Sequence, residues 1–280
     1  SSAASDVYKR QFLNRKIKRL LLLLVTIFLC ARMMGETIIP DSISNPIRTG
    51  FHPDPSICRV GEDYYLVTSS FTWFPGLPIY HSRDLTNWSL IGHALTNPKA
   101  IDFNGMTDND GIWAPTLRYH NGTFYLITTA HGCGGNFYMT AKNPAGPWSD
   151  PVWLKDAPGI DPSLFFDEDG RCYYTGNRWD FKSAWPAQCA VWMQELDLQK
   201  RCLVGERKTL AYGHAANAKY AEGPHLYKIK DHYLLLMAEG GSDYNHAVTA
   251  LTAKSLWGPY VPCTVNPCLL YTSPSPRDCS

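Results

Sequence analysis

Three carboxylates stand beside prolines in separate parts of the chain: Asp54 in HPDPS, Asp161 in IDPSLFF and Glu222 in AEGPH. Proline fixes its own backbone and restricts the residue before it, so the backbone at Asp54 and Asp161 should have little freedom. Carboxyl groups held close together cannot all ionise easily, so at least one of them acquires a raised pKa. A protonated and an ionised carboxyl would together supply a general acid and a general base.

Other uses of these acids stay open on the residues alone. They could form a metal cage or be satisfied by backbone amides, and Asp54 also fits an ordinary turn aspartate. An axial cation is compatible with the pattern, although acids spread over separate parts of the chain suit a substrate pocket better.

The elements that would position these acids form a repeat. From Gly50 onward, short apolar and aromatic runs alternate with Gly, Pro, Asp and Asn, which is typical of an all-β protein. Four runs resemble one another, each a turn followed by a strand that opens on aromatics: GEDYYLVTSS, NGTFYLITTA, DGRCYYTGN and KDHYLLLMAEGG. A second element, HSRDLTNW, TAKNPAGPW and TAKSLWGPY, recurs after three of them. The period of roughly 50–60 residues indicates a β-propeller, because a β-sandwich would not explain it.

The acids occupy equivalent places in this repeat. Asp54, Ala114, Asp161 and Glu222 each lie about eleven to thirteen residues before the reference tyrosine of their unit, at Tyr65, Tyr125, Tyr174 and Tyr233. They should therefore open the innermost strand of each blade and converge at one end of the axis. The spacing predicts a site shared by three blades.

Composition excludes some classes of function. The chain has 280 residues, a net charge of +1 and no basic block, which argues against nucleic acid as a partner. Its nine cysteines are scattered without metal-ligand spacing. We expect no metal site and no cofactor, and we leave His225 and His246 as structural histidines.

The two ends of the chain look foreign to the rest. DVYKRQ can be encoded by DNA whose reverse complement, read from its second base, translates as CLLYTS; these are residues 6–11 and 268–273. Both ends also resemble translated adapters of transposase-based sequencing libraries. We exclude residues 1–11 and 268–280 from fold reasoning, and we expect the natural protein to be cut short near Pro267.

A short apolar run, Leu20–Ala31, follows four basic residues and is too short to span a bilayer comfortably. This pattern predicts a secretory signal at 12–35, followed by a linker at 36–44. The protein should then be exported in the bacterial manner, with no transmembrane span in the mature chain. Cys30 is a weak indication of lipid attachment, because Leu29 before it is not a small residue.

Five ordered motifs resemble glycoside hydrolase family 43, in its β-xylosidase and α-L-arabinofuranosidase branch. They are GFHPDPSI, FTWFPGLPIYHSRDLTNW, GIWAPTLRYHNGTFYLITT, IDPSLFFDEDGRCYYTGN and YAEGPHLYKI, and the resemblance runs from 45 to 267. It implies a five-bladed β-propeller, here lacking most of its last blade, that hydrolyses glycosidic bonds with inversion. The expected substrates are xylan-derived oligosaccharides that yield xylose or arabinose.

The resemblance also assigns roles to residues. Asp54 would be the general base, Asp161 would tune the pKa of the acid and help to hold the substrate, and Glu222 would be the general acid. Phe71 and Trp113 would line the pocket for the terminal sugar, with Trp73 a weaker candidate. In an inverting enzyme the acid and base carboxyls stand about 6.5–9.5 Å apart.

The last blade of the family supplies an axial histidine and a substrate-binding arginine, and a β-sandwich domain often follows it. None of these follows Pro267, so residues 36–267 alone should turn over poorly. Two other readings remain: a non-catalytic carbohydrate-binding propeller, and a retaining glycosidase with a closer carboxylate pair. The sequence does not decide between xylose and arabinose, nor does it give the linkage or the oligomeric state.

Overall fold

The structure is a computed structural model that describes residues 42–180, 182–242 and 244–270. The chain divides into two compact units, Ser1–Ile43 and Ser44–Ser280, and every strand in the described ranges belongs to the second unit. The predicted signal segment at 12–35, the first adapter-like end and most of the second lie outside the described residues. No helix in the described ranges is long and apolar enough to cross a membrane.

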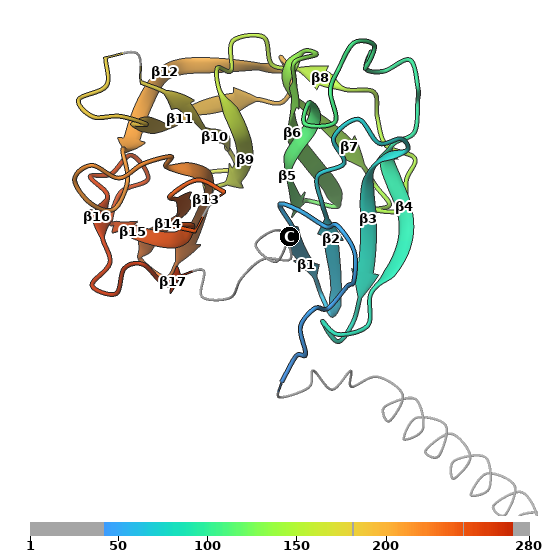
Figure 1. The fold of residues 1–280 in the computed structure, drawn as a ribbon, viewed down its shortest axis with the longest axis horizontal. Helices are drawn as coiled ribbons and strands as arrows, with labels where there is room; N and C mark the ends of the chain where they lie inside the picture. Colours follow the sequence, from blue (N-terminus) through green and yellow to red (C-terminus); the bar gives the residue numbers. More distant parts are fainter. Residues whose placement is uncertain (1–41, 181, 243, 271–280) are drawn as a thin grey trace, which may run out of the picture. The chain divides into compact units, whose positions relative to one another are not determined.

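The described chain is all-β, as predicted, and contains four consecutive antiparallel sheets of a β-propeller (Figure 1). The first sheet runs β1 (Ser56–Val60), β2 (Asp63–Val67), β3 (Gly76–Ser82) and β4 (Ser89–Leu95). The second runs β5 (Gly111–His120), β6 (Thr123–His131), β7 (Gly135–Ala141) and β8 (Val152–Trp153). The third runs β9 (Ile160–Phe166), β10 (Cys172–Trp179), β11 (Cys189–Asp197) and β12 (Cys202–Ala211).

The fourth sheet runs β13 (Glu222–Ile229), β14 (His232–Glu239), β15 (Ala247–Ala253) and β16 (Val261–Pro262). A short strand, β17 (Leu269–Leu270), also pairs with β15, through Leu270 opposite Ala247 and Leu269 opposite Val248. These two leucines belong to the segment whose adapter origin stays a prediction.

The repeat expected from the sequence matches these sheets. The four reference tyrosines, Tyr65, Tyr125, Tyr174 and Tyr233, lie on β2, β6, β10 and β14, the second strand of each blade. The recurring HSRD and TAK motifs fall where β3, β7 and β15 end. The four visible units are therefore four blades, and a fifth blade stays a prediction.

Alternation of side chains explains why these runs form strands. Along β14, Tyr233, Leu235, Met237 and Glu239 are buried while the residues between them are partly exposed. A period of two places one row of side chains on each face of the sheet. The buried row is apolar except for Glu239 at its end, so most of this face of the sheet is able to pack against apolar side chains.

The core lies between neighbouring blades. Three clusters of buried side chains each join two neighbouring blades. The first and second blades meet through Val67, Ile79, Ile112 and Leu126. The second and third meet through Ile127, Leu164, Tyr174 and Trp192, and the third and fourth through Val191, Met193, Leu226 and Leu235. Full burial of each such side chain is worth about 1.5–3 kcal/mol. Blade-to-blade packing therefore fixes the inner strands relative to one another: β5 contacts β1 and β9, and β9 contacts β13.

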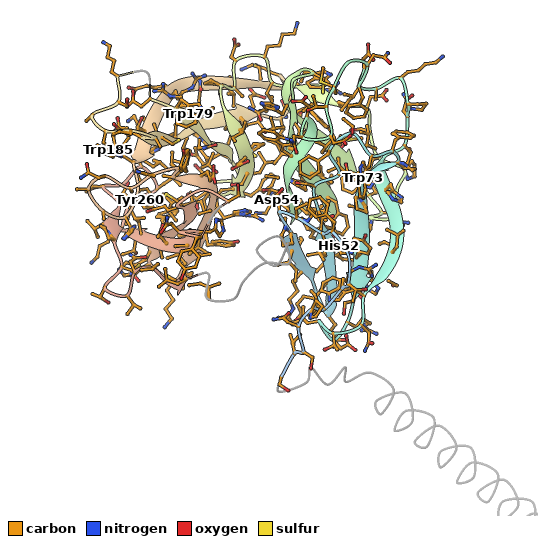
Figure 2. The ribbon with its side chains drawn as sticks, viewed as in Figure 1. His52, Asp54, Trp73, Trp179, Trp185 and Tyr260 are labelled. Carbon is orange, nitrogen blue, oxygen red and sulfur yellow. The ribbon has the colours of Figure 1, made fainter. Side chains whose placement is uncertain are left out.

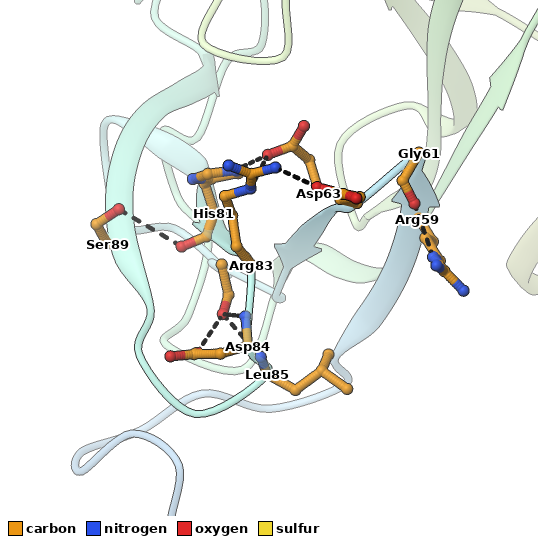
Figure 3. A network of polar contacts seen from close by, with 10 residues as sticks. Arg59, Gly61, Asp63, His81, Arg83, Asp84, Leu85 and Ser89 are labelled. Carbon is orange, nitrogen blue, oxygen red and sulfur yellow. Dashed lines mark hydrogen bonds and ion pairs between the residues drawn. The ribbon is translucent and has the colours of Figure 1, made fainter. Parts of the chain in front are cut away.

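The first blade carries a group of charges at the end where β1 turns into β2 (Figure 3). We call Glu62, Asp63, His81 and Arg83 the Asp63 cluster. His81 Nε2 lies 2.8 Å from Asp63 Oδ1, and Arg83 Nη2 donates to Glu62 Oε2 at 2.6 Å. The cluster ties the β1–β2 turn to the end of β3.

Candidate active site

The three carboxylates predicted from the sequence come from three inner strands. Asp54 lies just before β1, Asp161 is the second residue of β9 and Glu222 opens β13. Figure 2 shows Asp54 near the middle of the view, where these sheets converge. Ala114, in the equivalent place of the second blade, lies inside β5 rather than at its start.

The backbone that carries these residues is not extended. Asp54, Ala114 and Asp161 have φ angles of 51°, 29° and 53°, and each is followed by a proline. The sequence predicted restriction, and a residue before proline ordinarily takes the β region. A left-handed conformation at a non-glycine residue costs on the order of 1–3 kcal/mol and persists where the surroundings over-determine it, often at functional sites.

The fourth blade differs by one position. There the residue before the proline is Gly223, with a φ of 54°, and Glu222 precedes it. Glycine adopts this conformation without a Cβ penalty. Glu222 is therefore not at the position equivalent to Asp54 and Asp161, as the tyrosine spacing predicted, but one residue earlier, and it carries a side chain one methylene longer.

Ser69 holds Asp54, and sequence reasoning missed it. The Ser69 hydroxyl donates to Asp54 Oδ2 at 2.6 Å and accepts from the Ala114 amide at 2.7 Å, while the Ser69 amide donates to Pro53 O at 3.1 Å. The hydroxyl links Asp54 to the second blade. The signal in the sequence was the run of small polar residues after β2, Thr68, Ser69 and Ser70, all of which are buried.

Asp161 and Glu222 carry perturbed carboxyl groups. Burial, followed by the charges of Glu222 and Asp54, raises the pKa of Asp161 to about 7, although the Gly223 amide donates to its Oδ2 at 3.2 Å. Burial and the charge of Asp54 raise the pKa of Glu222 to about 7. The three acids therefore interact, and the site is able to hold a proton at neutral pH.

Phe71 and Trp113 flank the junction of the first two blades. Phe71 exchanges two backbone hydrogen bonds of 3.0 Å with Ile112, the residue before Trp113. Its ring stacks on Phe51 with centroids 5.8 Å apart. Trp73 is 64% exposed and lies 6.3 Å from Phe51, measured between ring centroids.

Trp113 is held from several directions. Its Nε1–H donates to Asn109 O at 2.7 Å, and its ring lies parallel to that of His131 with centroids 3.8 Å apart. His131 Nδ1 in turn lies 3.0 Å from Asp110 Oδ1. His131 covers one face of the indole, so a sugar ring would have to use the other face.

The histidines near the site motifs have protein partners. His225 Nδ1 lies 2.9 Å from Arg118 Nη2, and His246 Nδ1 lies 2.7 Å from Gly241 O. Within the described ranges, no group of three or more His, Cys, Asp or Glu residues is arranged to hold a metal ion.

Comparison with known proteins shows which family the chain resembles. The sequence model of the family described as glycosyl hydrolases family 43 matches residues 43–278. A xylosidase/arabinosidase of Butyrivibrio fibrisolvens is 47% identical over 80% of this chain and 44% of its own length. A non-reducing-end α-L-arabinofuranosidase of Bacteroides ovatus is 46% identical over 90% of this chain and 45% of its own length.

Solved structures agree. A family 43 enzyme from a capybara gut metagenome superposes with a TM-score of 0.78 at 41% identity, over 84% of this chain and 46% of that one. A xylan β-1,4-xylosidase of Bacillus halodurans gives 0.75 at 46% identity, over 81% and 44%. The chain thus spans about half the length of the relatives that it matches.

Proposed function

Because the chain belongs to glycosyl hydrolase family 43, we propose that the protein that contains it is an inverting glycosidase. It releases xylose, arabinose or both from xylan-derived oligosaccharides. The observation that carries this proposal is the meeting of three carboxylates from separate blades, two of them with a pKa raised to about 7. Relatives named for xylosidase and for arabinofuranosidase activity support both sugars.

The proposed mechanism uses two carboxyls. Glu222, protonated because of its raised pKa, gives its proton to the glycosidic oxygen as the bond to the anomeric carbon breaks. Asp54, held by Ser69, takes a proton from the water that attacks the opposite face of that carbon. The sugar leaves with inverted configuration, and exchange of protons with solvent restores both groups.

Asp161 acts on the acid in this proposal. Its carboxyl is fixed by the amide of Gly223, the residue that follows Glu222. The charge of Glu222 is one of the causes that raise the pKa of Asp161, so the two carboxyls resist ionising together, which favours the protonated form of Glu222 that the reaction needs. Phe71 and the free face of Trp113 would line the place of the terminal sugar.

The remaining sequence predictions belong to the same proposal. They are a five-bladed propeller of which four blades are described, a signal peptide at 12–35 with export, and adapter-derived ends. The domain bounds of 45–267 also stay a prediction, since the family match extends to 278.

The decisive experiment assays the full-length product of the gene on p-nitrophenyl β-xyloside and p-nitrophenyl α-L-arabinofuranoside. We expect turnover of at least one substrate, and NMR of the first product from the xyloside should show the α-anomer. Release of the β-anomer would mean retention, and no turnover with retained sugar binding would favour the non-catalytic propeller. The same assay on residues 36–267 tests whether that segment turns over poorly.

A further inference from the structure

The side chain of Arg118 reaches the backbones or side chains of three inner strands. Its own strand is β5, where Nη1 donates to Leu117 O at 3.2 Å. Its Nε donates to Leu164 O on β9 at 3.1 Å, and its Nη2 donates to His225 Nδ1 on β13 at 2.9 Å. One planar guanidinium thus contacts the second, third and fourth blades.

The bond to His225 defines the state of that histidine. A guanidinium has donors only, so Nδ1 of His225 must be the acceptor and the ring is neutral, with its proton on Nε2. Burial, and then the charge of Arg118, lowers the pKa of His225 to about 3. His225 therefore remains a neutral acceptor over the pH range in which the acids titrate.

Arg118 contacts one residue on β9 and one on β13, and each lies the same number of residues after an acid of its strand. Leu164 lies three residues after Asp161 on β9, and His225 lies three residues after Glu222 on β13. Direct bonds join the same strands between these levels: the Ser163 hydroxyl donates to Pro224 O at 2.6 Å, and the Gly223 amide donates to Asp161 Oδ2. Arg118 thus adds a third link between β9 and β13, farther along the strands from the acids than the other two.

We propose that Arg118 is a positioning residue, whose fork fixes β9 against β13 and so sets the placement of the Asp161 carboxyl relative to Glu222. This proposal rests on the glycosidase function proposed above. His225 is the acceptor through which the fork holds the β13 side. Arg118 would act on the reaction indirectly, through the position of Glu222, because its three hydrogen bonds go to Leu117 O, Leu164 O and His225 Nδ1 and not to the acids.

The chemistry of the side chain argues for this role over simple packing. A space between strands can be filled by apolar groups, which need no hydrogen-bond partners. Arg118 is half-buried, and its hydrogen bonds to acceptors on two neighbouring strands are what an apolar side chain could not supply. A lysine would supply the charge without the rigid fork that reaches two acceptors on different strands. Arg118→Met should therefore keep the fold and lose part of the catalytic geometry.

The test uses the full-length product and two substrates that differ in their need for an acid. Xylobiose has a poor leaving group that must be protonated, whereas 2,4-dinitrophenyl β-xyloside has a leaving group that departs without a proton. A displacement of about 1 Å at a catalytic group costs on the order of 10²-fold in rate. We expect Arg118→Met to lower kcat on xylobiose by about 10²-fold and on the dinitrophenyl xyloside by less than about threefold, with KM nearly unchanged.

Two further variants keep the test decisive if Arg118→Met fails to fold. His225→Asn retains an acceptor at the place of Nδ1 and should stay within about threefold of the wild type on both substrates. His225→Leu removes the acceptor and should reproduce the selective loss on xylobiose. Arg83→Met, in the Asp63 cluster, is the matched control and should change neither rate.

The outcomes separate this inference from the proposed function. A wild-type protein that cleaves neither these xylosides nor p-nitrophenyl α-L-arabinofuranoside contradicts the glycosidase function and the positioning role that depends on it. An active wild type whose Arg118→Met and His225→Leu variants lose both substrates equally, or lose neither, contradicts the positioning role alone.

Discussion

Two aspartates lie at opposite ends of the first blade, one among basic side chains and the other among acids. Asp63, where β2 begins, lies 2.8 Å from His81 Nε2 and 3.5 Å from Arg83 Nε, and its side chain is 38% exposed. Asp54, just before β1, accepts a hydrogen bond from the neutral hydroxyl of Ser69 and lies within electrostatic reach of Asp161 and Glu222.

The difference shows what perturbs a carboxyl in this fold. In the Asp63 cluster and the turn beside it, the acids contact basic side chains and amides, and Glu62 is exposed and Asp63 partly exposed. Hydrogen bonds from Asn87 and Thr86 hold the pKa of Asp84 well below its usual value. At the other end, burial and like charges raise the pKa of Asp161 and Glu222. Exposed acids that are paired with cations contribute little to stability. Buried acids that lie close together have raised pKa values, so one of them is able to remain protonated at neutral pH.

Removing either of the two carboxyls proposed to be catalytic should give the largest difference between the two ends of the first blade. Asp54→Asn and Glu222→Gln are each expected to lower kcat on xylobiose by about 10²–10⁴-fold, because each removes one proton transfer. Asp63→Asn is the matched control in the same blade and should leave kcat within about twofold. Steady-state kinetics of the three variants decide this, and near-normal turnover by Asp54→Asn would refute its role as the base.

Asp161→Asn should stabilise the protein above neutral pH. Burial raises the pKa of Asp161 from 3.8 to about 7 in the folded state, so the folded protein binds more protons than the unfolded chain between these values. The contribution of Asp161 to stability is complete below pH 4 and is lost as the pH rises to 7. At pH 8 the variant should gain about 4 kcal/mol, because each unit of the shift in pKa is worth about 1.4 kcal/mol; the gain should be seen as a higher Tm and be absent at pH 4.

Asp63→Asn should lower stability at pH 8, whereas Asp161→Asn should raise it. The Asp63 substitution removes an exposed ion pair and should lower the free energy of unfolding by less than about 1 kcal/mol at pH 8. Equal Tm shifts for the two asparagine variants would mean that Asp161 is no more perturbed than a surface acid.

The pH profile should show the raised pKa of the acid. Since Glu222 must be protonated and its pKa is raised to about 7, kcat/KM on xylobiose should fall above pH 7 by about tenfold per pH unit. The dinitrophenyl xyloside, which needs no acid, should lack this alkaline limb. An identical fall with both substrates would assign the limb to another group.

Salt provides the smallest effect. Arg83→Met should cost less than about 1 kcal/mol of stability at low ionic strength and still less at 1 M NaCl, because exposed ion pairs are screened. Thermal denaturation at two salt concentrations measures it. A loss that salt does not reduce would show that Arg83 contributes through packing.

Much of the site could be predicted from the sequence because it depends on local patterns. The alternation within β14, the turn motifs and the repeat period are local or periodic, and together they placed Asp54, Asp161 and Glu222 at or next to the start of inner strands. The alternation of short apolar runs with turn residues predicted an all-β chain, and the ordered motifs identified the family.

Other parts of the site depend on contacts between distant residues. Ser69 bridges Asp54 and Ala114 across two blades, and no spacing rule connects these three residues. Likewise the tyrosine period did not reveal that Gly223, rather than Glu222, takes the left-handed place before its proline. The φ angle of Gly223 and the hydrogen bond from its amide to Asp161 show that Glu222 lies one residue before the position that the spacing predicted.

Residue types and their periods account for the side chains available for the chemistry, for the strand alternation and for the order of the blades, and all three could be predicted before the fold was known. The perturbation of the acids by one another, the hydroxyl that holds Asp54 and the link from β9 to β13 through Arg118 became visible in the folded chain alone. The physical reason is that burial and charge interactions arise from packing between blades, and residues far apart in the chain become neighbours only when the sheets assemble.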